Sequence, residues 1–454
     1  MDKIVHIKTF GCQMNERDSE IMGQLLSRSG YIRSDEPEAA DLILVNTCSI
    51  RDKAEQKVYS LLGQLRDLKS KKSNIRIGVC GCVAQQEGRK IIERMPHVDM
   101  VIGTQQLYQL PALLARLDTG ELRQAIALDL DPVFSIPPFQ HLLRDDDLQK
   151  KSESHSSVQR YVNIMQGCNN FCSYCVVPYT RGREISRPLA DIMEEARLLV
   201  TQGVREITLL GQNVNSYGKT NAVAPQAIAF PDLLRAVAEI DGLKRLRFTT
   251  SHPKDLDLAL MRCFAELEIL CPHFHLPVQS GSSKVLARMN RGYTAEAYLA
   301  KVEQLREIRP DIALATDFIV GFPGESEEDF AETLQLLETV QFHSSFSFKY
   351  SDRPQARSTS FTDKIAEAVK SERLARLQSL QNEISLQWNN SLMHEEVEVL
   401  VEQVQAKNGR GRSSANQVVH FHLLADHPLP VVGDLIQVRI EYAGPHSLRG
   451  AMLT

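Results

Sequence analysis

Residues 167–175 read Gly-Cys-Asn-Asn-Phe-Cys-Ser-Tyr-Cys, so that Cys168, Cys172 and Cys175 fall within eight residues of one another. A strand-like apolar run over 160–165 comes directly before them. Barrels built from β/α units place their reactive groups on the loops that follow the strands. This stretch therefore predicts both the fold of the central region and the location of its chemistry.

Strand-like runs continue to alternate with helical stretches from here to about Gln387. The six runs cover 160–165, 206–210, 245–249, 273–276, 312–320 and 344–350. Such alternation predicts a β/α barrel, and six units instead of eight predict a partial one. We expect this central domain to span 158–390.

The three clustered cysteines indicate a metal site. A structural zinc site needs four ligands, and no nearby Cys or His completes this group. Three thiolates suit a 4Fe-4S cluster that keeps one iron open, because full ligation takes four cysteines. The chain has nine cysteines and no secretory signal, so we expect a reducing compartment in which clustered cysteines are ligands or catalytic thiols, not disulfides.

The first 131 residues repeat a pattern of short apolar runs followed by helical stretches, which predicts a parallel α/β sheet. The runs cover 4–10, 42–45, 75–79 and 98–102, and the helices lie near 19–28, 53–68 and 84–94. We therefore predict an N-terminal α/β domain over 1–131.

Three further cysteines, Cys12, Cys48 and Cys82, each follow a predicted strand of this domain. The carboxyl ends of parallel strands lie together, so residues far apart in sequence can meet there. A single buried cysteine is usually a packing residue. Three in equivalent turns favour a second metal site.

Two segments differ from the α/β pattern. Residues 132–157 are rich in Pro, Asp and Ser and are expected to form an exposed linker. Residues 391–454 carry alternating runs at 396–401, 417–422 and 435–440, with turns at 408–409, 426–428 and 432–434. This final segment is predicted to be a small all-β domain.

Composition excludes several classes of protein. No apolar run approaches the roughly 18 residues that a membrane span requires, so we expect no membrane contact and a cytoplasmic protein. The formal net charge is -5, so any nucleic-acid site must be a local basic patch.

The cysteine motif, with an aromatic residue before its last cysteine, resembles that of radical S-adenosylmethionine enzymes, and its surroundings resemble the methylthiotransferase family. The resemblance covers almost the whole chain. Its specific stretches are 9–20 (beginning Thr-Phe-Gly-Cys-Gln-Met-Asn), 46–51, 177–187, 210–218, 251–253, 275–282 and 317–325. One departure occurs at 353–357, Arg-Pro-Gln-Ala-Arg, where Gly-Thr usually follows Arg-Pro in the family.

The resemblance implies two 4Fe-4S clusters. Cys168, Cys172 and Cys175 would hold the cluster that cleaves S-adenosylmethionine, and Cys12, Cys48 and Cys82 an auxiliary one. Cys80 competes with Cys82 for that role, and we prefer Cys82 because it lies in the family's Gly-Cys-x-Ala-Gln match.

The opening motif resembles the members that act on N(6)-dimethylallyladenosine of tRNA. The implied reaction is methylthiolation of the C-2 position of this nucleoside at position 37, beside the anticodon. S-adenosylmethionine would serve as both radical source and methyl donor. The implied partners are tRNA and an electron donor such as a flavodoxin or ferredoxin. The alternatives are the same chemistry on threonylcarbamoyladenosine tRNA or on a ribosomal protein, and a noncatalytic iron–sulfur protein that binds RNA.

Several other residues are candidates for ligand contacts. Those proposed for S-adenosylmethionine are Tyr174, Gly211, Gln212, Gln279, Gly321 and Phe322, and the alternative for each loop residue is an ordinary βα turn. Arg181, Arg183 and Arg187 could bind phosphate or carboxylate, although exposed, solvated arginines are commoner. The C-terminal domain resembles the RNA-binding TRAM domain, and Arg410, Arg412 and Arg449 are its candidate RNA contacts.

Overall fold

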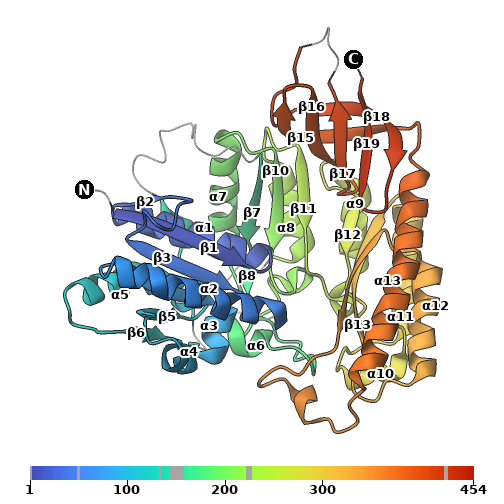
Figure 1. Cartoon of the computed structure of the whole chain (residues 1–454). Coiled ribbons are helices and arrows are strands. Elements are labelled where there is room, and N and C mark those ends of the chain that lie inside the picture. The colour runs from blue at the N-terminus through green and yellow to red at the C-terminus, as the bar shows by residue number, and fades with distance from the viewer. Residues whose placement is uncertain are drawn as a thin grey trace.

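The computed structural model describes residues 3–48, 52–131, 134–143, 158–220, 228–423 and 428–453. These residues form an N-terminal α/β unit, a central half-open barrel and a C-terminal β-barrel (Figure 1). The predicted α/β class, with a small all-β module at the end, is confirmed. The predicted turn at 426–428 lies largely outside the described residues, as do residues 49–51 of one family stretch.

The N-terminal unit contains one parallel sheet with the order β2-β1-β3-β4-β5-β6. Its strands are β1 (Lys3–Phe10), β2 (Tyr31–Arg33), β3 (Leu42–Thr47), β4 (Arg76–Gly81), β5 (Met100–Ile102) and β6 (Ala125–Ala127). Its helices are α1 (Gln13–Arg28), α2 (Asp52–Lys71), α3 (Cys82–Glu87), α4 (Arg89–Arg94) and α5 (Leu110–Asp118), with a 3-10 turn η1 (Gln106–Gln109). Apolar side chains of α1 and α5 pack on one face of the sheet and those of α2 and α4 on the other. This arrangement buries the central strands on both faces, which explains their continuous apolar runs.

Two expectations for the first 143 residues need correction. The helix predicted over 84–94 is divided into α3 and α4 at Gly88, whose φ of 55° interrupts a right-handed helix. The predicted exposed linker is partly buried, because Phe139 and Leu142 of the 3-10 turn η2 (Phe139–Leu142) pack between α1 and Leu198. Their three-residue spacing puts both side chains on one face of the turn.

The central unit has the six predicted strands: β7 (Gln159–Asn163), β10 (Glu206–Leu210), β11 (Arg245–Phe248), β12 (His273–His275), β13 (Ala313–Val320) and β14 (Ser344–Lys349). They form two parallel sheets of three, β7-β10-β11 and β12-β13-β14, connected by a single bridge between Leu246 and Leu270. Among the described residues β7 and β14 do not pair, so the barrel is open on one side (Figure 1). A short hairpin, β8 (Met165–Gln166) and β9 (Ile185–Ser186), flanks the cysteine loop.

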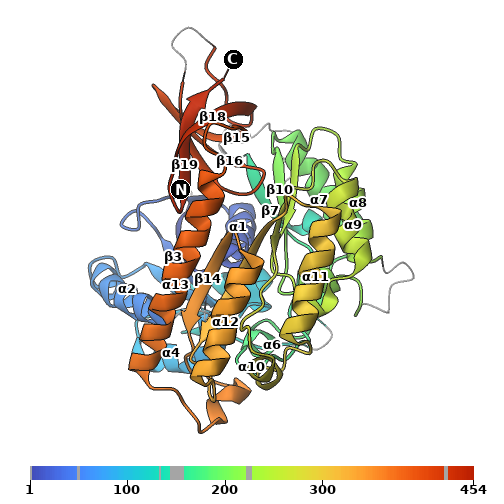
Figure 2. The same cartoon turned by 90° about the vertical axis from the view of Figure 1, so that its right-hand side faces the viewer.

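Helices cover the outside of this barrel (Figure 2). They are α7 (Leu189–Thr201), α8 (Phe230–Ala238), α9 (Leu258–Glu266), α11 (Ala295–Ile308), α12 (Glu327–Val340) and α13 (Glu367–Asn390). Shorter turns are α6 (Val177–Thr180), α10 (Ser283–Arg288), η3 (Val214–Ser216), η4 (Pro253–Asp255) and η5 (Arg357–Ser360). Within the described residues no helix is long and apolar enough to cross a membrane.

The C-terminal unit is a closed barrel with the strand order β15-β16-β17-β19-β18. The strands are β15 (Glu396–Gln405), β16 (Asn408–Ser413), β17 (Val418–His422), β18 (Leu435–Ala443) and β19 (Ser447–Met452). The turn predicted at 408–409 lies two residues earlier, because Gln405 pairs with Asn408. Gly409 belongs to the strand, where a Cβ atom would lie 2.2 Å from the Phe421 ring.

Arg245 and Arg247, near the start of β11, connect this barrel to the central one. Arg245 donates to the Arg412 carbonyl over 2.6 Å, and Arg247 donates to the carbonyls of Ser413 and Ser414, each over 2.8 Å. The C-terminal unit therefore lies at the amino ends of the central strands, opposite the end at which β7 leads into the cysteine loop (Figure 1).

Candidate iron–sulfur centres and reaction chamber

Cys12, Cys48 and Cys82 lie at the carboxyl end of the N-terminal sheet, as predicted. Cys12 is the residue before α1, Cys48 follows β3, and Cys82 begins α3. Close approach of the turns depends on Gly11, where a Cβ atom would lie 2.6 Å from the Cys48 Cβ. Gly81, at a φ of 89°, likewise leaves no space for a side chain. The turns can converge because these two positions are glycines.

The thiols of this group differ in how readily they ionise. A hydrogen bond with Cys48 lowers the pKa of Cys12 to about 6 against the opposing effect of burial, and the positive charge of Arg181 contributes. Burial raises the pKa of Cys82, although Arg181 opposes that shift. One thiolate is therefore favoured near neutral pH, in a group that a cation would stabilise further.

Cys80 differs from Cys82 in its surroundings. It lies within β4, is fully buried, and packs in the apolar cluster beneath α1 and α5. Burial raises its pKa to about 12. By contrast, Cys82 acts electrostatically on Cys12 and Arg181. These surroundings fit Cys80 as a packing residue.

The second group, Cys168, Cys172 and Cys175, occupies the loop after β8 at the carboxyl end of the central barrel. The Cys168 amide donates to the Gly182 carbonyl over 3.3 Å, and the Val177 amide donates to Cys175 Sγ over 3.5 Å. Burial raises the pKa of Cys168 to about 11, and burial together with the neighbouring Cys172 raises that of Cys175 to about 12. The loop thus collects two buried thiols and the partly buried thiol of Cys175, whose thiolate forms would repel one another.

Arg291 is a residue of this centre that the sequence reasoning did not identify. It is buried and donates from Nη1 to Cys172 Sγ and to the Tyr174 hydroxyl, each over 3.4 Å, and from Nη2 to the Pro277 carbonyl over 2.6 Å. Arg291 therefore places a buried cation against the Cys172 sulfur. The Met-Asn-Arg-Gly sequence at 289–292 carries no metal-ligand spacing, so only its place next to the cysteines reveals the role.

Both groups fit clusters better than single metal ions. Among the described residues, no group of three or more His, Cys, Asp or Glu side chains could bind one metal ion. A four-iron cluster is wider than an ion and takes its thiolates at separate corners. In each group neighbouring thiols affect one another, and a positively charged partner such as iron would stabilise the thiolate forms.

The predicted cofactor residues lie on the loops around the second group. Gln212 accepts from the Gly167 amide over 2.5 Å, which fixes the start of the cysteine loop, and its buried Nε2 has no hydrogen-bond partner among the described residues. Gln279 adopts a φ of 78° and Gly321 a φ of 69°. Phe322 is fully buried against Tyr350, so its side chain is a packing group and only its backbone is available to a cofactor.

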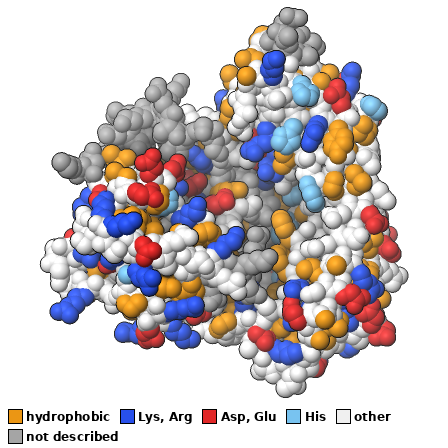
Figure 3. Space-filling model, viewed as in Figure 1, with side chains coloured by type: hydrophobic (Ala, Val, Ile, Leu, Met, Phe, Trp, Pro, Cys, Tyr) orange, Lys and Arg blue, Asp and Glu red, His pale blue; other side chains and the backbone are white. Residues whose placement is uncertain are grey.

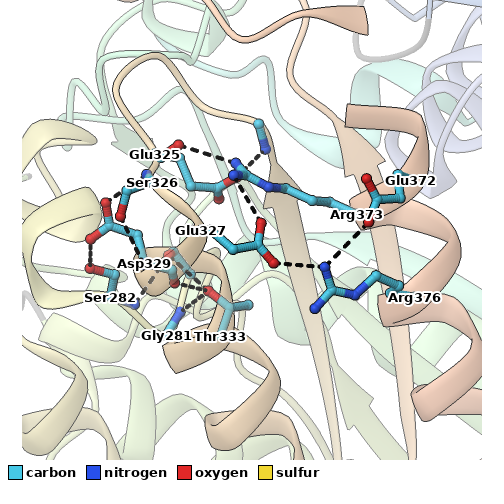
Figure 4. Close-up of polar contacts among 12 residues, drawn as sticks. Gly281, Ser282, Glu325, Ser326, Glu327, Asp329, Thr333, Glu372, Arg373 and Arg376 are labelled. Atoms are coloured by element: carbon cyan, nitrogen blue, oxygen red, sulfur yellow. Dashed lines mark hydrogen bonds and ion pairs between the residues drawn. The ribbon is translucent and has the colours of Figure 1, made fainter. Parts of the chain in front are cut away.

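The loops after β12 and β13 are connected through the first turn of α12 (Figure 4). Ser282 donates to Asp329 over 2.7 Å, and Asp329 completes a capping box with Ser326. The Gly321 amide donates to Glu325 over 2.6 Å, and Glu325 forms a buried ion pair with Arg373 of α13 at 2.7 Å. These contacts hold both loops in one rigid arrangement beside the cysteine loop.

A polar chamber lies inside the central barrel. His275 Nε2 donates to Asp317 Oδ1 over 3.0 Å, and His275 Nδ1 lies 3.4 Å from the Thr249 hydroxyl. Asp317 pairs in register with Phe346 of β14, so that both side chains face the same side of the sheet. Their neighbour Phe318 packs instead under the outer helices, which identifies the Asp317 face as the interior.

The chamber opens toward the N-terminal unit. The face drawn in Figure 3 is hollowed between the N-terminal unit and the central barrel. Phe346 keeps 57% of its surface exposed there, the highest value for an aromatic side chain inside the barrel among those described. Asp317 Oδ2 accepts no hydrogen bond within the described part of the chain. Sequence reasoning missed this pair because Asp317 and Phe346 belong to two different strands.

The three arginines after the cysteine loop are not equivalent. Arg181 and Arg187 are buried, contrary to the commoner solvated case. Arg187 pairs with Asp191 and Glu195, at 2.6 and 2.7 Å. Arg183 is exposed and stacks on Phe171, with its guanidinium carbon 4.3 Å from the ring centroid. None of the three is therefore a freely solvated cation.

A groove of about 480 Å³ on the C-terminal barrel contains two of the three predicted RNA contacts. Arg410, His420 and Arg449 are in register across β16, β17 and β19 and line it together. Arg412 does not line the groove, and Glu402 pairs with Arg412 at 2.9 Å and with Arg410 at 3.5 Å. The groove thus presents a row of basic and imidazole side chains without Arg412.

Two family models match the chain. The model described as Uncharacterized protein family UPF0004 matches residues 4–103, and the Radical SAM superfamily model matches residues 162–337. Both cysteine groups fall within these ranges.

Curated relatives match from end to end, and three of them share the name tRNA-2-methylthio-N(6)-dimethylallyladenosine synthase. The protein from Desulfotalea psychrophila is 53% identical, over 98% of both chains. That from Syntrophobacter fumaroxidans is 48% identical, over 100% of this chain and 96% of its own. That from Geobacter sulfurreducens is 46% identical, over 100% of this chain and 98% of its own.

Solved structures share the fold at low identity. The radical S-adenosylmethionine methyltransferase TsrM from Kitasatospora setae, with cobalamin and a [4Fe-4S] cluster bound, matches with a TM-score of 0.56 at 15% identity, over 79% of this chain and 77% of its own. The cobalamin-dependent S-adenosylmethionine radical enzyme OxsB matches with a TM-score of 0.53 at 11% identity, over 84% of this chain and 56% of its own. At such identities the likeness concerns the fold alone.

Proposed function

The chain belongs to the tRNA-2-methylthio-N(6)-dimethylallyladenosine synthases, which are radical S-adenosylmethionine enzymes, and we propose on this basis how its residues serve the reaction. The protein is a transferase that introduces a methylthio group into N(6)-dimethylallyladenosine of tRNA and uses S-adenosylmethionine and 4Fe-4S clusters. The full-length identity to these relatives carries the conclusion. We place the reaction at C-2 of the nucleoside at position 37.

Each cysteine group is assigned one cluster. Cys168, Cys172 and Cys175 would hold the cluster that binds S-adenosylmethionine, with Tyr174, Gln212, Gln279 and the backbone of 321–322 around the cofactor. Cys12, Cys48 and Cys82 would hold the auxiliary cluster. When bound, these groups supply a radical that removes the C-2 hydrogen, and the sulfur and methyl group that replace it.

The chamber is assigned to the substrate base. Phe346 offers an exposed aromatic face on which a purine can stack, and Asp317 Oδ2 is free to accept the N6–H of the modified adenine. His275 fixes the Asp317 carboxylate through its hydrogen bond to Oδ1. Ile319, two residues further along β13, packs against the same apolar cluster as Tyr174, so the base would lie next to the cysteine loop.

The RNA backbone is assigned to the groove on the C-terminal barrel. Arg410 and Arg449 can contact phosphates, and Arg412 contributes less because it lies outside the groove. A flavodoxin or ferredoxin would supply the electron. The cytoplasm would provide both tRNA and the reducing conditions that free thiols require.

The test is anaerobic reconstitution with iron and sulfide, followed by iron counting. Nucleosides are then analysed by mass spectrometry after incubation with reductant, S-adenosylmethionine and dimethylallyl-modified tRNA. We expect about eight irons per chain, two four-iron clusters, and a methylthio product. Cys82→Ala should lose about four irons, whereas the matched variant Cys80→Ala should keep them all. About four irons in the unmodified chain, without product, would contradict the assignment.

Substrate choice is tested separately with unmodified, dimethylallyl-modified and threonylcarbamoyl-modified tRNA. Only the dimethylallyl form should be converted at the full rate. Equal conversion of all three would refute the substrate assignment. A noncatalytic scaffold would convert none, even with both clusters loaded.

A further inference from the structure

Arg181 connects the two cysteine groups. It follows α6 in the loop after Cys175, and the next residue, Gly182, accepts a hydrogen bond from the Cys168 amide. The same loop packs tightly on the N-terminal unit. Thr104 donates to the Thr180 carbonyl over 2.5 Å, and a Cβ atom on Gly182 would lie 2.6 Å from Gln105 Nε2. Movement of either cysteine group would therefore be transmitted to this loop.

The Arg181 guanidinium enters the N-terminal unit and is only partly paired there. The residue is 3% exposed. Its Nη2 donates to Asp18 Oδ2 over 2.6 Å, but Nη1 has no hydrogen-bond partner in the described part of the chain. An unsatisfied donor on a buried cation costs free energy, on the order of 1–3 kcal/mol. Arg181 Nη1 therefore requires a hydrogen-bond acceptor that is present when the protein carries its cofactors.

The candidate acceptors around this guanidinium are sulfur atoms. Arg181 directly follows α6, which packs against α3, the helix that begins at Cys82. Its partner Asp18 lies on α1, the helix that follows Cys12. Cys48 completes the same group. The buried donor therefore points to the place where the thiolates and sulfides of an auxiliary cluster would carry negative charge.

We propose that Arg181 is a positioning residue that donates from Nη1 to a sulfur of the auxiliary cluster, either the Cys82 thiolate or a bridging sulfide. This inference rests on the proposed function and extends it. Hydrogen bonds to cluster sulfurs and nearby positive charge both raise the reduction potential of a cluster. Arg181 would thus set the potential of the sulfur-donating site from a loop of the radical domain.

The competing explanation is that Arg181 only attaches the two units through Asp18. Arg17 provides a matched control for it. Arg17, from α1, pairs with the buried Glu195 of α7 across the same interface and likewise has an unpartnered buried Nε among the described residues. Unlike Arg181, its guanidinium pairs with two carboxylates, those of Glu20 and Glu195.

The experiment uses the full chain in which Cys168, Cys172 and Cys175 are replaced by Ala, so that only the auxiliary cluster forms. Into this background are introduced Arg181→Gln, Arg181→Lys and Arg17→Gln. After anaerobic reconstitution, iron and sulfide are counted and the midpoint potential is measured by potentiometry with electron paramagnetic resonance. This readout does not depend on turnover, so its result is separate from the test of the proposed function.

We expect Arg181→Gln to shift the potential downward and alter the resonance signal. Arg181→Lys should restore most of the potential, and Arg17→Gln should leave it unchanged. Loss of the cluster from Arg181→Gln alone would support the proposal equally. The same potential in Arg181→Gln as in the background, equal shifts in Arg181→Gln and Arg17→Gln, or loss of the cluster from all three variants would overturn it.

Discussion

In the proposed function Asp317 and Phe346 each contact the substrate base. Replacing either residue should therefore weaken RNA binding and leave S-adenosylmethionine affinity unchanged. Phe346→Ala removes a stacking surface worth about 1–3 kcal/mol per base, which corresponds to a loss of roughly 5- to 150-fold in affinity. Asp317→Asn should weaken binding because the ionised acceptor is lost. The measurement is the dissociation constant of a dimethylallyl-modified anticodon stem-loop, with S-adenosylmethionine affinity measured alongside.

Leu258→Ala is the control for these two variants, because Leu258 is also an exposed apolar side chain but lies on α9, outside the barrel. It should bind RNA as the unmodified protein does. If Phe346→Ala and Asp317→Asn lost S-adenosylmethionine affinity and kept RNA affinity, the chamber would instead take the adenine of the cofactor.

Gln355 occupies a position that favours glycine. Its φ is 70°, in the left-handed region that favours glycine, and the family resemblance leads us to expect glycine after Arg353-Pro354. A non-glycine residue pays about 1–2 kcal/mol for this conformation, and glycine loses about 0.5–1 kcal/mol more chain entropy on folding. Gln355→Gly should therefore stabilise the barrel by up to about 1 kcal/mol, measured as a higher thermal midpoint. A lower midpoint would show that Gln355 makes a compensating contact.

Among its contacts with the barrel, helix α13 makes one buried ion pair and takes part in one exposed group of charges (Figure 4). Arg373 is buried and pairs with the buried Glu325, whereas Arg376 is 43% exposed on its side chain and pairs with Glu327 and Glu372. Arg373→Met leaves the Glu325 carboxylate buried without its partner, which should cost about 3–5 kcal/mol. Arg376→Met, the matched change on the exposed side, should cost about 0–1 kcal/mol.

The difference should be visible in thermal unfolding of the cluster-free chain. Arg373→Met should also weaken S-adenosylmethionine binding, since Glu325 accepts from the Gly321 amide in the cofactor loop. Equal midpoints for the two variants would mean that α13 is held by its apolar contacts alone.

The sequence predicted the elements where periodicity is decisive. All six barrel strands and the strand-to-helix positions of Cys12, Cys48 and Cys82 follow from local patterns. The failures have local physical causes. Gly88 interrupts an otherwise continuous helical pattern, and Gly409 looks like a turn residue although the Phe421 ring requires glycine within the strand.

At the scale of the whole molecule, contacts between units could not be predicted. Arg181 and Asp18 are 163 positions apart, and Arg245 contacts Arg412 across 167 positions. Sequence periodicity cannot pair such residues, because each residue meets its hydrogen-bond partner only in the assembled fold. The same holds for Arg291 and Cys172, and for Phe346 beside Asp317. The candidate metal ligands and some neighbours such as Tyr174 and Gln212 were therefore accessible from sequence, whereas the contacts of Arg291 and Phe346 were not.

The C-terminal groove gives the last prediction, because it must provide RNA affinity on a chain whose formal net charge is -5. Each phosphate contact contributes about 0.9 to the slope of log affinity against log salt for duplex nucleic acid and about 0.7 for single strands. The double variant Arg410→Ala/Arg449→Ala should therefore lower the slope for tRNA by roughly 1.4–1.8 and weaken binding. Arg412→Ala should change the slope little, since Arg412 lies outside the groove and makes the closer pair with Glu402. If Arg412→Ala reduced the slope as much as the double variant, the phosphates would follow the face of Glu402 instead of the Arg410–His420–Arg449 row.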